Sequence, residues 1–213
     1  MKEDLTDEKN LATIRGLVER AAIYRAVFTR TALISGALSI LTAGAIFVND
    51  ELTQFLDRPV RAREFAFAWV DVFFLTLVVN IFFLWRAARG NADSFGSARM
   101  KLVWRMIVPV LLIPAGFTAW FFGTGYLGGA ELDLIVVWIV FYGLTLLSTA
   151  FFAPRSIALL GWAFLLTGLS VPVLADKIEN WVGSVPTVLM GVTFGLYQLV
   201  FAAMTWLRER QEV

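Results

Sequence analysis

The chain has 213 residues, and its composition is that of a membrane protein rather than of a soluble domain. Hydrophobic residues make up 59% of it, charged residues only 16%, and the mean hydropathy is +0.74, whereas a soluble domain is about 45–50% apolar and about 25% charged. The sequence has no His, no Cys and a net charge of +1. These counts exclude disulfides, imidazole or thiolate metal sites, and catalysis by a histidine base or a cysteine nucleophile. They also give no sign of a nucleic-acid partner.

Residues 1–29 are predicted to form a cytoplasmic amphipathic segment. Thr6 is suited to cap a helix in which Leu11, Ile14 and Val18 recur at helical spacing, with basic residues between them. Two interpretations remain open: the segment leads directly into the first membrane span, or it is a docking helix for a cytoplasmic partner.

The run Ile14-Arg15-Gly16-Leu17-Val18-Glu19-Arg20 precedes a first span rich in Gly, Ala and Ser. This IRxxxER-type segment resembles the opening of a group of uncharacterised bacterial six-helix inner-membrane proteins. The resemblance covers the N-terminal segment and the overall span layout. It implies a bacterial inner membrane and no particular activity.

Six apolar stretches are long enough to cross a bilayer core about 30 Å thick as helices. They are Arg30–Val48, Phe65–Trp85, Leu102–Phe122, Leu132–Phe152, Ile157–Ala175 and Val185–Leu207. Transmembrane strands are disfavoured because the apolar runs do not alternate with a period of two. The sequence therefore predicts an all-α, six-helix transmembrane bundle over residues 30–207, with a cytoplasmic tail at 208–213.

The positions of the basic residues predict the orientation of these spans. Of the 18 Lys and Arg, only Arg58, Arg61, Arg63 and Lys177 fall on the side opposite the termini. By the positive-inside rule, both termini are expected in the cytoplasm. The tryptophans predict two aromatic belts, with Trp85, Trp104, Trp162 and Trp206 near the inner ends of the spans, and Trp69, Trp120, Trp138 and Trp181 near the outer ends.

Asp71 is the most informative polar residue, because it lies about six residues, or roughly 9 Å, inside the second span. An acid at such a position costs on the order of 2.5–3.5 kcal/mol and is by default a functional candidate. Glu64 precedes it on the same helical face and would extend a polar track to the outer surface. The structural alternative is that Asp71 reaches interfacial water or bonds a neighbouring helix.

Asn80 and Gln198 are the other costly polar residues within the spans. Asn80 is about 180° around the helix from Asp71, so the two cannot line one face. Both amides are expected to form hydrogen bonds between helices. With a single acid well inside a span, no catalytic pair is available, and we expect no enzymatic activity, cofactor or metal.

Small residues predict close helix packing at Gly191 and Gly195 in the sixth span and at Gly36 in the first. This packing could be intramolecular or could form a homodimer face. Pro109 and Pro114 predict a kink in the third span.

The second loop is flanked by a basic cluster of Arg86, Arg89, Arg99 and Lys101. Anionic lipid headgroups are its expected contacts, at about 1 kcal/mol per basic residue; a phosphate-bearing ligand is the alternative.

Two functions are compatible with these features. The first is a small-solute or proton-coupled transporter or channel, indicated by Asp71 and the kinked third span. The second is a non-catalytic regulatory or assembly subunit that docks a partner through its N-terminal helix. Membrane lipids are expected partners in both cases, and either a homo-oligomer or a membrane or cytoplasmic protein partner remains open.

Overall fold

The computed structural model describes residues 29–50, 62–88, 98–124, 131–149, 155–179 and 185–211, all of them helical. The predicted amphipathic segment, residues 1–29, lies outside these ranges except for its last residue. The helices are Thr29–Asp50, α2 (Ala62–Ala88), α4 (Ala98–Thr124), α5 (Glu131–Thr149), α6 (Arg155–Glu179) and a last helix made of α7 (Val185–Met190), η1 (Gly191–Tyr197) and α8 (Gln198–Gln211). Each predicted span coincides with one of them, with ends that differ by at most four residues.

Five of these helices are long and apolar enough to cross a membrane. Their outer surfaces expose large apolar side chains, such as Val173 at 78%, Leu41 at 71% and Phe74 at 67% exposure. Such a surface is stable in lipid and not in water, so the chain is a multi-pass integral membrane protein. Helix α4 differs, because the apolar segment described within it, Leu112–Thr124, is shorter than a membrane span. The predicted count of six spans is therefore not confirmed.

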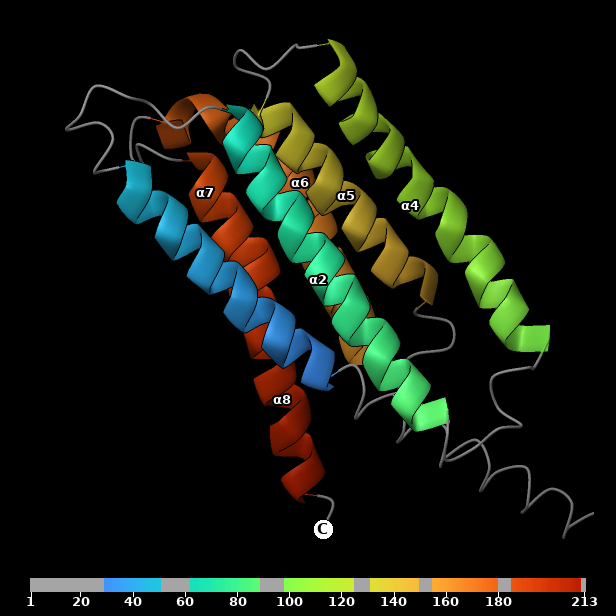
Figure 1. Cartoon of the computed structure of the whole chain (residues 1–213). Helices are drawn as coiled ribbons and strands as arrows, with labels where there is room; N and C mark the ends of the chain where they lie inside the picture. The colour runs from blue at the N-terminus through green and yellow to red at the C-terminus, as the bar shows by residue number, and fades with distance from the viewer. Residues whose placement is uncertain are drawn as a thin grey trace, which may run out of the picture.

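Successive helices run in alternating directions through the bundle (Figure 1). As a result, the beginning of the Thr29–Asp50 helix and the end of α8 lie at the same end of the molecule. Helix α4 is continuous through Pro109 and Pro114, and it lies beside α5 at the edge of the bundle.

Helices α5 and α6 pack closely along their length, because three glycines let their backbones approach. A Cβ atom at Gly143 would lie 2.9 Å from both the Gly161 oxygen and the Leu165 nitrogen. A Cβ at Gly168 would lie 2.6 Å from Cγ2 of Val140. Only glycine leaves room for this contact, which replaces side-chain interdigitation by direct backbone packing.

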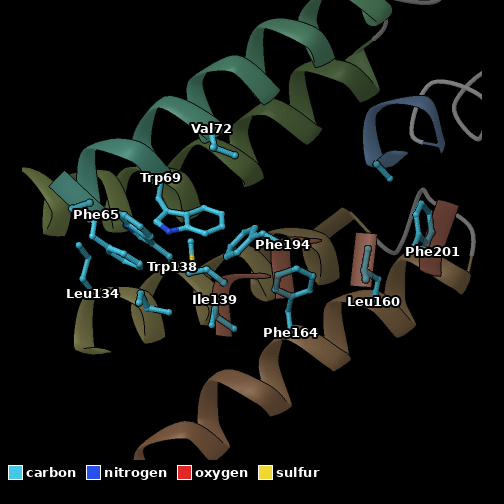
Figure 2. Packing of buried hydrophobic residues seen from close by; sticks show 14 of the residues in the cluster. Phe65, Trp69, Val72, Leu134, Trp138, Ile139, Leu160, Phe164, Phe194 and Phe201 are labelled. Atoms are coloured by element: carbon cyan, nitrogen blue, oxygen red, sulfur yellow. The ribbon is translucent and has the colours of Figure 1, made fainter. Parts of the chain in front are cut away.

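Aromatic side chains fill the centre of the bundle (Figure 2). The ring of Phe194, from η1, lies 4.9 Å from Phe73 of α2, 5.1 Å from Tyr142 of α5 and 5.1 Å from Phe164 of α6, measured between ring centroids. These edge-on contacts are the favoured geometry for aromatic pairs. Phe194 therefore joins four helical segments at one point.

The two predicted tryptophan belts are only partly correct. Trp85, Trp162, Trp206 and Trp120 are exposed near the ends of their helices, as a belt requires. Trp69 and Trp138, assigned to the outer belt, are instead buried in the core at 0% and 5% exposure. Trp138 satisfies its indole N–H by donating to Oγ1 of Thr118 over 2.8 Å, so it links α5 to α4 rather than to headgroups.

Candidate functional site

Asp71 lies on the side of α2 that points away from the rest of the bundle. The inner face of this helix buries Phe65, Ala66, Trp69 and Val72, whereas Asp71 points to the opposite side and is exposed. Within the part of the chain that the structure describes, its carboxylate meets no cation. An intramembrane acid is thus presented to the surroundings of the bundle instead of to its interior.

The neighbours of Asp71 on this face are large and apolar. Phe74, Leu75, Val78 and Phe82 follow it at helical spacings of three, four, seven and eleven residues, and each is at least 45% exposed. We call Asp71 and these four residues the Asp71 face. It is an apolar stripe with one acid at its N-terminal end.

Glu64 lies two turns before Asp71 on the same side of α2 and is also exposed. Asn80 lies on the inner side, where it is half-buried. The structure thus separates the predicted polar residues into an outward pair, Glu64 and Asp71, and inward amides. They do not come together in one site.

Gln198, the second inward amide, is buried at the start of α8. Its side-chain nitrogen donates to Oη of Tyr142 on α5 over 2.7 Å. One helical turn further along α6 from Phe164, Thr167 shares a 2.9 Å hydrogen bond with the Tyr197 hydroxyl. These bonds connect the last helix to α5 and α6 and satisfy polar groups that lipid could not.

The π-helical turn η1, Gly191–Tyr197, occupies the middle of the last helix. It ends beside Gln198 and contains both Phe194 and Tyr197, so the polar and aromatic contacts of the core converge on it. Such π turns occur often at functional sites. The sequence analysis missed this centre; its only signal was the density of Gly, Tyr and Gln within the sixth span.

Among the residues that the structure describes, three buried polar atoms lack hydrogen-bond partners: Nε1 of Trp69, Oγ1 of Thr76 and Oγ1 of Thr31. Trp69 and Thr76 lie on the inner face of α2, two turns apart. Threonine can bond its own helix after a rotamer change, whereas the indole N–H of Trp69 has no such local option.

The predicted glycine contacts lie inside the chain. A Cβ at Gly195 would lie 2.6 Å from Cδ1 of Ile40, and one at Gly191 would lie 3.1 Å from Cβ of Ala43. A Cβ at Gly36 would lie 3.0 Å from the Gly195 oxygen. The glycine ridge of the last helix is therefore occupied by the Thr29–Asp50 helix, and it is not open to a second copy.

Of the predicted headgroup contacts, Arg86 is exposed in the last turn of α2. Arg99 and Lys101 belong to the first turn of α4, and Arg89 lies outside the described residues. The last turn of α2 and the first turn of α4 face the same end of the bundle (Figure 1).

No protein-family model matches the chain, and no curated protein and no solved structure is significantly similar to it. The function of the chain therefore has to be inferred from its own residues. The resemblance to bacterial six-helix membrane proteins remains a prediction from the sequence.

Proposed function

We propose that the protein is a non-catalytic assembly or regulatory subunit of a membrane complex. The observation that carries this proposal is the outward position of Asp71 on an otherwise apolar face of α2. An acid exposed to lipid costs on the order of 2.5–3.5 kcal/mol. A protein neighbour that covers the acid would remove this cost.

The interior of the bundle supports the same conclusion. Aromatic rings fill its centre, and the charged residues whose side chains are described, such as Glu64, Asp71, Arg86 and Lys177, are exposed, apart from Asp50, which is half-buried at the end of its helix. A carrier of ions or charged solutes needs charged or convergent polar groups along an internal route. Within the described part of the chain no charged residue is buried, and interior polar groups such as Gln198 and Tyr142 are already bonded to each other.

The test is native mass spectrometry of the tagged protein, extracted in mild detergent from its own membranes. We expect a stoichiometric second polypeptide with the wild-type chain and its loss in Asp71→Leu. Glu64→Leu is the matched control, because it removes an acid from the same side of α2 at the membrane edge and should retain the partner. A wild-type chain that is always a lone protomer would contradict the proposal.

For the orientation, we propose six spans in a bacterial inner membrane with both ends cytoplasmic. The excess of basic residues on the terminal side supports this arrangement, as does the return of the chain to the end from which it started. Because the chain has no Cys, Ser94→Cys and Gly128→Cys would each carry one thiol. If α4 crosses the membrane, an impermeant thiol reagent labels Gly128→Cys in spheroplasts, and Ser94→Cys only after lysis. Labelling of both from one side would exclude the crossing.

A small-solute or proton-coupled transporter is the second candidate, and η1 is the observation that favours it. The Gln198–Tyr142 and Thr167–Tyr197 bonds meet at this π turn, where local helix distortion could accompany passage of a solute. In this case Gln198→Leu would abolish flux in proteoliposomes while the protein stays folded. Unchanged flux would eliminate this route.

A further inference from the structure

We infer that the Asp71 face binds a transmembrane helix of another protein, and that this helix carries a Lys or Arg at the same level in the membrane as Asp71. This inference rests on the proposed subunit function and specifies the chemistry of the partner. It is drawn from three features: the depth of Asp71, the apolar residues around it, and the absence of a cation beside its carboxylate among the residues that the structure describes.

Asp71 lies too deep in its span for its carboxylate to reach interfacial water. In the apolar stretch Glu64–Phe83, it lies about 10 Å from the first residue and about 18 Å from the last. An Asp side chain is short and cannot extend along the helix as Lys and Arg do. Its carboxylate therefore needs a partner at its own level.

The residues around Asp71 are suited to a helix rather than to a polar ligand. Phe74, Leu75, Val78 and Phe82 continue the stripe for about three turns beyond the acid, and all are exposed. A partner helix that packs along this stripe would bury apolar side chains over its length and meet a single acid at one position. Its complement is a helix that is apolar apart from one cation.

A second copy packed symmetrically through this face does not supply that cation. None of the 18 Lys and Arg lies between Glu64 and Phe83. In the other membrane helices, Arg105 is the basic residue furthest from a helix end, and it lies about 28 Å from Thr124 at the outer end of α4. Asp71 is only about 10 Å from the outer end of its own span. Two copies with the same orientation would place acid against acid, which disfavours a symmetric pair through this face.

The test uses a designed transmembrane peptide as the probe, because the natural partner is not needed to examine the chemistry of the face. The peptide is a polyleucine helix with one Lys about 10 Å from its outer end, at the level of Asp71, and it is labelled with a fluorophore. The comparison peptide has Leu at that position. Each is reconstituted with the full chain in liposomes, and association is measured by energy transfer to a fluorophore on a single Cys introduced at position 213.

We expect the Lys peptide to associate with the wild-type chain about tenfold more strongly than the Leu peptide, the low end of what close charge pairs contribute across an interface. Asp71→Leu should abolish this difference. The double variant Asp71→Leu/Leu75→Asp returns the acid to the same face one turn deeper. It should restore the preference for a peptide whose Lys is moved by four residues.

Equal association of the Lys and Leu peptides with the wild-type chain would overturn the inference. So would a preference that persists in Asp71→Leu. Self-association of the wild-type chain that is lost in Asp71→Leu would assign the face to a second copy instead. If the Lys peptide shows no preference but mass spectrometry still detects a native partner, only the inferred Lys or Arg on that partner is refuted. Absence of any native partner would refute the subunit function itself.

Discussion

Two parts of the bundle are held together in different ways. The α5–α6 pair and the pair formed by η1 and the Thr29–Asp50 helix approach through glycines, with backbone atoms close to the opposing helix. Helix α2 instead contacts its neighbours through large rings: Phe73 against Trp138 and Phe194, and Phe67 stacked on Phe122. In lipid, apolar burial gives little drive for helix association, so close packing must supply it. The glycine pairs have that packing on their own, whereas α2, beyond the contact of Phe67 with Phe122, leaves an apolar face with an acid uncovered.

The largest effect should come from removing the ring at which the two parts meet. Phe194→Ala eliminates contacts with three aromatic neighbours, and we expect a loss of about 3 kcal/mol in the free energy of unfolding. Phe74→Ala truncates an exposed ring on α2 and should change it by less than about 0.5 kcal/mol. Unfolding in mixed detergent micelles, followed by tryptophan fluorescence, measures both. Equal effects of the two truncations would show that the aromatic centre does not hold the bundle together.

A smaller loss should follow from a methyl group between α5 and α6. Gly143→Ala places Cβ 2.9 Å from two backbone atoms of α6, which no rotamer change can relieve, so the helices must separate at a cost of about 1–3 kcal/mol. At Gly116 of α4, a Cβ meets nothing within 4 Å. Gly116→Ala should therefore stabilise the helix, by about 0.5–1 kcal/mol. The same unfolding titration measures the stability of both variants. If Gly143→Ala leaves the free energy of unfolding unchanged, α5 and α6 pack less closely than the structure shows.

The smallest effect is expected at the buried amide. Gln198→Leu removes the hydrogen bond to Tyr142, and bonds of this kind between membrane helices contribute about 0.6 kcal/mol, with an upper limit of about 1.7. A double-mutant cycle with Tyr142→Phe isolates this term. A coupling energy near zero would show that this 2.7 Å hydrogen bond does not contribute to the stability of the bundle.

Much of the fold could be predicted from the sequence, because bilayer thickness and hydropathy determine where a helix can cross. The predicted spans accordingly lie on the observed helices. The inward or outward direction of individual side chains was harder to predict, since helices that are apolar on all sides have no polar face to orient them. This is why Trp69 and Trp138 were placed in a belt rather than in the core.

The site could be predicted only residue by residue. Asp71 stood out because an acid is rare in a span, but its outward direction depends on which side of α2 packs against α5 and η1. The pairing of Gln198 with Tyr142 joins residues 56 positions apart, and no local pattern encodes it. The π turn at Gly191–Tyr197 also shifts the helical register, so a regular period of 3.6 residues misplaces the faces that follow it.

The most direct measurement is photo-crosslinking from the surface of the bundle in native membranes. A photoreactive amino acid at Phe74 or Val78 samples the Asp71 face, and one at Leu166 of α6, which is 60% exposed, samples an apolar surface with no acid within two turns. We predict a single protein adduct from Phe74 and Val78 that disappears when Asp71→Leu is added, and only lipid adducts from Leu166. Lipid adducts alone at all three positions, or a protein adduct indifferent to Asp71, would contradict the assignment of this face to a membrane partner.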